Sequence, residues 1–384
     1  VEGSRPLAVL DYAPFPRQNV RILRVRREDV LQLSPIREPD LALSVYLAPH
    51  ILEAVRDWGI DVVEATDFLA PALPLFQGLQ TAPGAENVLC VTYNHGFVED
   101  FHEADQIRTD EHIQTDLLGE RQQCRASDLV VAPSLCARDR LASYGIRNHV
   151  AVVREPYPFA KRAEVTGVRH DLTYFGRVSL SKGIDKIILF ANATQPVFGY
   201  AQVKLVGRII PTPFRRHDMK DYVRARIAPE LRDRILFTDF LDREAALDLL
   251  EPGAICPSLG SAETFSYACV ESIDCGLIPV VRHGTPMAEF VPEALQHHVL
   301  DMRMRSVREM QRQFERTVAE GPEFLEGVRA HCEETLAPAK IAAEMTELYE
   351  TRLARKKGLV SAAVRAPARL GDVTVLILSL IHIS

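Results

Sequence analysis

Two motifs in the second half of the chain combine charged side chains with turn residues in a way that suits a phosphate ligand. The first is FGRVSLSKG, residues 175–183, in which a strand-like segment is followed by a turn at Gly176 and by Arg177 and Lys182. Arginine presents a planar fork of donors and lysine a compact point charge, so the pair is suited to a diphosphate. A helix that begins near Lys182 would add the positive end of its dipole. A surface loop with ordinary charges is an equally good interpretation of this motif alone.

The second motif places two carboxylates beside a loop. The stretch PSLGSAETFSYACVESIDCGLIPVV carries Glu263 in the loop and Glu271 inside a helix-like segment, with seven residues between them. The aromatic and small residues between the glutamates indicate partial burial. A carboxylate can accept hydrogen bonds from both hydroxyls of a vicinal diol, such as that of a ribose or a hexose. Beside Arg177 and Lys182 the motif would fit a nucleoside diphosphate that carries a sugar. The plainer alternative is a solvated helix face.

The elements that must position these motifs alternate between strand and helix along the chain. Short apolar strands are predicted in two runs, one in each half, with helical segments between them. This alternation predicts parallel sheets of an α/β fold. A proline-broken boundary near residues 158–170 separates the two runs, so we expect two doubly wound domains. Such sheets bind ligands at the C-terminal edge of their strands, which is where both motifs lie.

Length and composition limit the class of protein. A chain of 384 residues suits two domains, and 47% hydrophobic with 25% charged residues is typical of a globular protein. The formal net charge of -7 argues against a nucleic-acid partner, which would need a basic face. Seven cysteines without a CxxC pair indicate reduced thiols and a cytoplasmic protein. The sequence shows no signal-peptide pattern and no apolar run of the roughly 20 residues that span a bilayer.

Taken together, the motifs resemble those of the family 4 retaining glycosyltransferases, which have the GT-B fold. The resemblance rests on FGRVSLSKG, on the spacing of Glu263 and Glu271, and on the following HGTPMAE. Weaker matches are DVVEATD, VTYNHG and SDLVVAPSLCARDRL. The resemblance extends over about residues 60–350, in the family's order. It implies two Rossmann-like domains that face each other across a cleft.

On this resemblance the chain divides into five parts. Residues 1–160 would form an N-terminal domain on the acceptor side, residues 161–335 a C-terminal domain that binds the nucleotide sugar, and residues 336–355 a helix that packs back towards the first domain. A linker, residues 356–372, and an apolar strand, residues 373–384, follow. We interpret the strand as an orphan strand of a further domain or a spurious tail. A strand added to an existing sheet is the alternative.

The resemblance also implies roles for residues at matching positions. Arg177 and Lys182 would neutralise the donor diphosphate as it leaves. Glu263 would face the sugar hydroxyls, and His95, at a strand end of the first domain, would reach the transferred sugar across the cleft. For His95 a purely structural role is an equal alternative. Donor binding would further use Gly176, the carboxylate of Glu271 on the ribose diol, and the backbone amides of Thr264, Phe265, Ser266 and Tyr267.

The sequence departs from the family at two places. Ser266 stands where the family usually has glycine, and a side chain there is expected to narrow the donor pocket. The glycine-rich loop that follows the family's first strand has no match in residues 1–40. The first domain is therefore expected to lack its first strand and this loop, which would weaken donor binding.

The activity implied is transfer of a hexose-type sugar from a nucleoside diphosphate donor to a hydroxyl acceptor with retention of configuration, as in polysaccharide biosynthesis. The acceptor is left open between a glycan, a lipid-linked and a small molecule, and so are peripheral membrane association and a fused second glycosyltransferase domain. No cofactor and no metal are expected. His297 and His298, in a segment predicted as a strand, have no carboxylate or cysteine near them in the sequence. The alternatives are a nucleotide-sugar 2-epimerase of the same fold and a non-catalytic nucleotide-sugar-binding module of a larger synthase.

Overall fold

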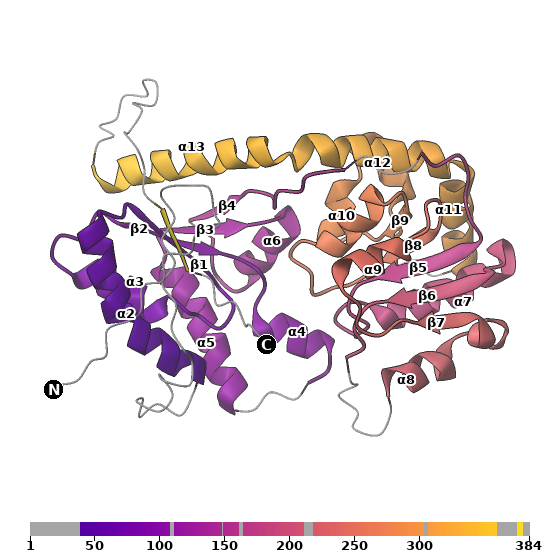
Figure 1. Ribbon diagram of the computed structural model, residues 1–384, viewed down its shortest axis with the longest axis horizontal. Helices are drawn as coiled ribbons and strands as arrows, with labels where there is room; N and C mark the ends of the chain where they lie inside the picture. The colour runs from indigo at the N-terminus through magenta and orange to yellow at the C-terminus, as the bar shows by residue number, and fades with distance from the viewer. Residues whose placement is uncertain are drawn as a thin grey trace.

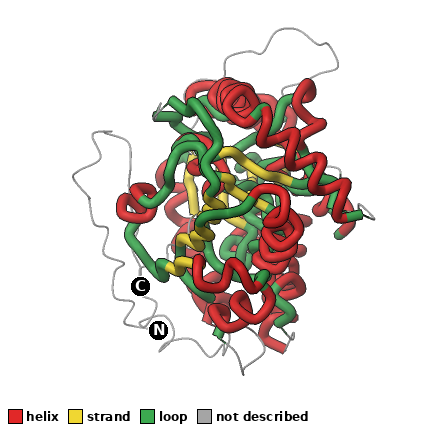
Figure 2. Tube along the Cα trace, turned by 90° about the vertical axis from the view of Figure 1, so that its right-hand side faces the viewer, coloured by secondary structure: helices red, strands yellow, loops and turns green. Residues whose placement is uncertain are grey.

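The computed structural model describes residues 39–107, 111–147, 149–160, 164–210, 218–302, 306–358 and 375–378, and of residues 39–41, 111–117 and 375–378 the backbone alone. These residues form two α/β domains, each around a five-stranded parallel sheet, as the sequence predicts. Figure 1 shows the domains side by side, and in Figure 2 helices surround the strands of the domain that faces the viewer. No helix in the described ranges is both long and apolar enough to pass through a membrane.

The sheet of the first domain has the strand order β10-β1-β2-β3-β4, and all its strand pairs are parallel. Its strands are short apolar runs, and all four residues of β3 are buried, as is usual where helices cover both faces of a parallel sheet. The strands are β1 (Val62–Thr66), β2 (Leu89–Tyr93), β3 (Leu129–Ala132), β4 (Val150–Val152) and β10 (Val375–Leu378).

Helices cover the two faces of this sheet by packing on alternate side chains of the same strands. Val63 and Cys90 pack with α2 and α3, whereas their neighbours Val62 and Leu89 pack with α13. The helices of the first domain are α2 (Pro39–Trp58), α3 (Leu73–Thr81), α4 (Val98–Ala104), α5 (Glu111–Ala126) and α6 (Leu135–Ser143).

The sheet of the second domain has the order β7-β6-β5-β8-β9, again parallel throughout. The chain order reverses between β5 and β8, and such a switch point leaves a crevice at the carboxyl ends of the two strands. The strands are β5 (Asp171–Phe175), β6 (Gln202–Val206), β7 (Ile235–Phe237), β8 (Ile255–Ser258) and β9 (Ile278–Val281). The α-helices are α7 (Ile184–Phe198), α8 (Met219–Arg226), α9 (Arg243–Asp248), α10 (Tyr267–Asp274), α11 (Val307–Ala319) and α12 (Gly321–Thr335), and the 3₁₀ helices are η1 (Pro229–Arg234), η2 (Pro286–Phe290) and η3 (Glu293–His298).

The chain returns to the first domain through α12 and α13 (Pro338–Lys356), which run along the top of Figure 1. Ile341, Tyr349 and Leu353 of α13 pack on the first sheet. At the end of the helix, Lys356 Nζ donates to the Val88 carbonyl at 2.7 Å, and Lys357 Nζ lies 2.8 Å from a carboxylate oxygen of Asp61. The last helix therefore fastens the second domain to the outer face of the first.

The C-terminal strand corrects the sequence analysis. Instead of being an orphan, β10 pairs in parallel with β1, with Val62 opposite Val375 and Ala65 opposite Leu378. The alternative interpretation, a strand added to an existing sheet, describes these four residues. The physical reason is that the side of β1 away from β2 has backbone donors and acceptors to satisfy, and an apolar extended segment can pair with them. Residues 1–38, where the glycine-rich loop was expected to be missing, and residues 359–372 of the predicted linker lie outside the described residues.

Candidate active site

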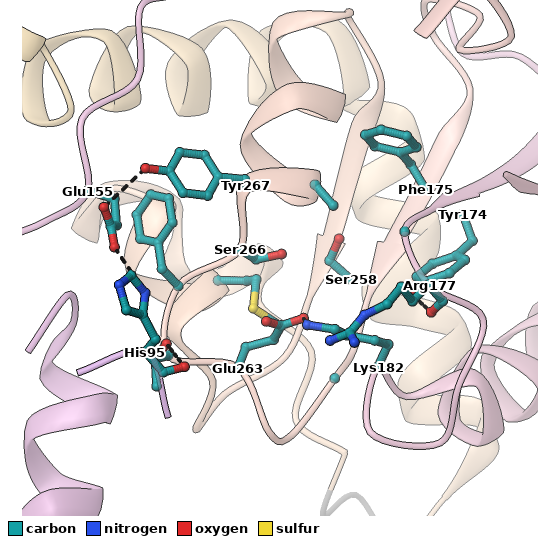
Figure 3. A pocket seen from close by; sticks show the side chains of 16 residues that line it. His95, Glu155, Tyr174, Phe175, Arg177, Lys182, Ser258, Glu263, Ser266 and Tyr267 are labelled. Atoms are coloured by element: carbon teal, nitrogen blue, oxygen red, sulfur yellow. Dashed lines mark hydrogen bonds and ion pairs between the residues drawn. The ribbon is translucent and has the colours of Figure 1, made fainter. Parts of the chain in front are cut away.

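A cavity of about 330 Å³ lies between the two domains at the carboxyl ends of β5 and β8. Its position is the one expected for a ligand site in a doubly wound sheet. Figure 3 shows the side chains of the sixteen residues that line it. All the site residues predicted from the sequence except Glu271 are among them, namely His95, Gly176, Arg177, Lys182, Glu263, Thr264, Phe265, Ser266 and Tyr267.

The loop after β5 forms the wall that carries the cations. Gly176 has a φ of +136°, and a Cβ there would lie 3.0 Å from the Tyr174 hydroxyl oxygen, so the turn needs glycine. The Tyr174 hydroxyl donates to the Arg177 carbonyl at 2.8 Å and fixes the turn. Gly183 closes the loop at a φ of +82°, where a Cβ would lie 2.8 Å from the backbone nitrogen of Gly260. The two motif loops therefore touch, backbone against backbone.

Lys182 and Glu263 join these loops with an ion pair. The Lys182 Nζ to Glu263 Oε1 distance is 2.7 Å, and the side chains are 18% and 14% exposed. The ring of Phe101, from α4 of the first domain, lies 5.9 Å from the same ammonium group. A ligand phosphate can replace the carboxylate as the partner of Lys182, because both are anionic acceptors. Glu263 would then be available to accept hydrogen bonds from hydroxyl groups.

Ser266 has a local role that explains its departure from glycine. Its φ of −151° is ordinary extended backbone, so no glycine is required at this position. The Ser266 hydroxyl accepts the backbone N–H of Cys269 and caps α10. Its side chain also lines the cavity, at the positive end of that helix.

Glu271 is the predicted site residue that the structure leaves outside the cavity lining. It lies on α10, one turn after Tyr267, and its side chain is 15% exposed. Arg243, at the start of α9, binds its Oε1 through Nε at 2.8 Å and through Nη2 at 2.7 Å. The carboxylate must leave this fork before it can accept hydrogen bonds from a diol.

His95 enters the cavity from the first domain, after the end of β2. The Asp67 carboxylate, fully buried after β1, accepts the backbone N–H of His95 at 2.8 Å and also a hydrogen bond from the Asn94 side chain. Burial raises the pKa of the Asp67 carboxyl, although these hydrogen bonds act to lower it. The imidazole of His95 itself is half-exposed to the cavity. Asp67 therefore fixes the backbone that follows β2, and this backbone positions His95.

Glu155 is a cavity residue that the sequence analysis missed. It follows β4, and its side chain is 12% exposed. One carboxylate oxygen accepts the Tyr267 hydroxyl at 3.1 Å, and the other lies 3.8 Å from His95 Nδ1, as Figure 3 shows. Burial raises the pKa of the Glu155 carboxyl, whereas His95 and the Tyr267 hydroxyl act in the opposite direction. Its place after a strand and before a proline is the sequence signal that could have identified it.

Polar contacts hold the two domains together around the cavity. Ser134 donates to the Thr264 carbonyl at 2.7 Å, and Thr264 donates in turn to the His95 carbonyl at 3.1 Å. Arg140 donates to the Ser261 carbonyl at 2.6 Å. The Glu289 carboxylate accepts two backbone N–H groups at the start of α6, at 3.0 and 2.9 Å. The loop that carries Glu263 is thus bonded to the first domain as well as to its own.

Comparison with known proteins supports the same architecture. Residues 7–157 match the model of Glycosyltransferase Family 4. No match to a curated protein was found. The structure is similar to sucrose-phosphate synthase from Thermosynechococcus elongatus, with a TM-score of 0.64 at 18% sequence identity over 91% of this chain and 86% of that one.

Two further solved structures have the same arrangement. HepE of Anabaena in complex with UDP has a TM-score of 0.59 at 16% identity, over 80% of this chain and 82% of that one. An α,α-trehalose-phosphate synthase (UDP-forming) from Burkholderia xenovorans in complex with glucose-6-phosphate has a TM-score of 0.58 at 13% identity, over 85% and 80%. Likeness at these identities shows the fold. It confirms the GT-B architecture that the motifs implied.

Proposed function

We propose that this chain, which has the GT-B fold and matches Glycosyltransferase Family 4 over its first domain, transfers a hexose-type sugar from a nucleoside diphosphate donor to a hydroxyl acceptor. The observation that carries the proposal is the convergence of Arg177, Lys182 and Glu263 on one cavity at the switch point of the second sheet. Two cations suit the diphosphate, and the carboxylate suits sugar hydroxyls.

The chemical contribution of the second domain is electrostatic. As the bond between the sugar's anomeric carbon and the phosphate oxygen breaks, negative charge develops on the leaving diphosphate. Arg177 and Lys182 would stabilise that charge, and fixed cations in a water-poor site are more effective than the same groups in water. No metal is needed for this role, so addition of EDTA should leave the rate unchanged.

The outcome at the anomeric carbon would be retention. The acceptor hydroxyl attacks from the face that the diphosphate leaves, its oxygen bonds to the anomeric carbon, and its proton passes to the leaving phosphate. His95 and Glu155 lie on the opposite side of the cavity from Arg177 and Lys182, where they would orient the sugar and the acceptor. The contacts between the domains would keep water, a competing acceptor, out of the site.

The donor is proposed to be a UDP-sugar, because HepE is described with UDP and the trehalose-phosphate synthase as UDP-forming. The acceptor is proposed to be a glycan, a lipid-linked or a small hydroxyl compound, and the reaction is assigned to the cytoplasm, where free thiols persist. The seven cysteines all lie in the described part of the chain, where they are thiols rather than disulfides, and six of them are buried.

The test is release of nucleoside diphosphate from UDP-, GDP- and ADP-sugars in the presence of a set of hydroxyl acceptors. We expect turnover of one donor class and an α-linked product from an α-linked donor, read by the anomeric coupling constant in proton NMR. Absence of both binding and turnover across the panel would overturn the proposal. Conversion of the donor into its 2-epimer without an acceptor would instead identify an epimerase, and binding without turnover a nucleotide-sugar-binding module.

A further inference from the structure

A second group of potential ligands lies away from the cavity, where η3 meets the junction of α11 and α12. It consists of His297, His298 and Glu320, none of which lines the cavity. Glu320 Oε2 lies 3.2 Å from His298 Nε2 and 3.9 Å from His297 Nε2. The sequence analysis found no carboxylate near these histidines because Glu320 is distant in the chain. It also expected a strand where the structure has the 3₁₀ helix η3.

The two imidazoles are held in place by packing and by hydrogen bonds. The Gln313 side chain on α11 donates to the carbonyls of His297 at 3.2 Å and of Val299 at 2.6 Å, which fixes the end of η3. The ring of His298 lies against the ring of Phe324, with centroids 4.4 Å apart. Its neighbour His297 lies over it at 4.1 Å. His298 is therefore held by buried contacts, and the end of η3 that carries both histidines is held by Gln313 of α11.

The hydrogen bonds around His298 within the described residues leave its ring nitrogen Nε2 without a partner. The Thr317 hydroxyl donates to the Gln313 carbonyl at 3.2 Å, which leaves its oxygen able to accept from an Nδ1–H of His298, also at 3.2 Å. In this tautomer Nε2 carries a lone pair. The His298 side chain is fully buried, and its Nε2 makes no hydrogen bond within the described part of the chain. That lone pair faces the Glu320 carboxylate, which is itself an acceptor.

A metal ion between His298 Nε2 and the Glu320 carboxylate would give both groups a partner. Two imidazole nitrogens and a carboxylate oxygen are the ligands that Zn²⁺ and its neighbours in the first transition row prefer.

We propose that His297, His298 and Glu320 bind a divalent transition-metal ion of the zinc class. Two ligand atoms about 2.1 Å from a tetrahedral ion lie about 3.4 Å apart, and the distances of 3.2 and 3.9 Å lie on either side of this value. The side chains of His297 and Glu320 are 43% and 52% exposed, so an ion can enter from solvent and keep a water as its fourth ligand. The bound ion would fasten η3 to the α11–α12 junction.

The test uses the full chain after treatment with a chelator and removal of that chelator. Co²⁺ is added as a spectroscopic probe, and Zn²⁺ affinity is measured by competition with a chromophoric chelator. We expect one equivalent of Co²⁺ to give the visible absorption of a tetrahedral site, Zn²⁺ to displace it, and Zn²⁺ to raise the melting temperature. Glu320→Gln and His297→Ala should each weaken binding by about tenfold or more.

The matched control is His283→Ala, which removes an exposed histidine of the same domain outside the cluster. It should bind Co²⁺ and Zn²⁺ as the wild type does. Circular dichroism of the metal-free variants verifies that each one folds. Equal Zn²⁺ affinity of the wild type and Glu320→Gln, or absence of stoichiometric Co²⁺ binding by the wild type, would overturn the proposal. Donor turnover is measured separately, because the metal site does not depend on it.

Discussion

The two faces of the cavity differ in charge and in how strongly they are desolvated. The face from the second domain carries Arg177 and the Lys182–Glu263 ion pair, in which each charge has an opposite partner. The face from the first domain carries Glu155, whose carboxylate lies 3.8 Å from Nδ1 of the half-exposed His95. The buried Asp67 carboxylate accepts the backbone N–H of the same histidine. Burial raises the pKa of both first-domain carboxyls.

This difference indicates a division of labour between the domains. On the second-domain face, a ligand phosphate can replace Glu263 as the partner of Lys182 at little energetic cost, since Lys182 keeps an anionic acceptor throughout. On the first-domain face, carboxylates are buried at a cost in free energy. Such burial is typical of functional sites and destabilises the fold. Loss of Lys182 should therefore act mainly on turnover, whereas neutralisation of Glu155 should also raise stability.

The largest effect is expected for Lys182→Ala. Removal of a cation that stabilises the leaving diphosphate should lower kcat/KM for the donor by about 100-fold or more. Lys186→Ala is the matched control, since Lys186 lies four residues further along and pairs with Asp185 outside the cavity. Steady-state release of nucleoside diphosphate measures both. Equal rates for the two variants would refute the assignment of the cationic face to the donor.

A smaller effect is expected from the pair Glu271 and Arg243. If Glu271 binds the ribose diol, Glu271→Ala should raise the donor KM by about tenfold, because a hydrogen bond to a charged group contributes on the order of 1.5 kcal/mol. Arg243→Ala should lower the KM, since it frees the carboxylate in advance. Little change in kcat is expected from either substitution. An unchanged donor KM in Glu271→Ala would show that Glu271 does not bind the donor and serves only in the ion pair with Arg243.

The first-domain face is tested by Glu155→Gln through stability. The pKa of Glu155 is raised in the fold, so the stability linked to its protonated form is complete at acidic pH and is lost as the pH rises through that raised pKa. The neutral glutamine keeps an acceptor for the Tyr267 hydroxyl without the buried charge. We expect the variant to melt above the wild type at neutral pH, by about 2–4 °C per kcal/mol gained.

The same comparison supplies its own control. Below the ordinary pKa of a glutamate, both proteins have an uncharged side chain, and their melting temperatures should converge. Thermal unfolding followed by circular dichroism across this pH range measures the difference. A gap that widens towards acidic pH would show that Glu155 is stabilised as a carboxylate, and the contrast between the two faces would fail.

The smallest effect is expected at Ser266. Ser266→Ala removes the hydroxyl that caps α10 and should destabilise the protein by about 1 kcal/mol, whereas Ser266→Gly should cost only a few tenths. Urea unfolding distinguishes the two. If the serine side chain narrows the pocket, Ser266→Gly should also accept bulkier donor analogues, measured by competition with the natural donor. Equal destabilisation by alanine and glycine would mean that the cap is not what serine contributes.

Much of the donor side of the site could be predicted from the sequence because its residues are close together in the chain. Gly176, Arg177 and Lys182 follow one strand, and Glu263 follows a strand adjacent to it in the sheet. Parallel strands end at the same edge, so local motifs at two strand ends converge without further information. The α/β class followed from the same alternation of strands and helices.

The remaining features depended on contacts between distant segments. Glu263 and Glu271 carry the same side chain, yet one lies in the cavity with Lys182 and the other outside its lining with Arg243, because helix α10 turns the second away. Glu155 meets Tyr267, and Glu320 meets His298, only through packing across domains or helices. The sequence thus determined which strand ends carry charged groups. The tertiary structure decided which partner each group has, since burial and hydrogen bonding are properties of the packed fold.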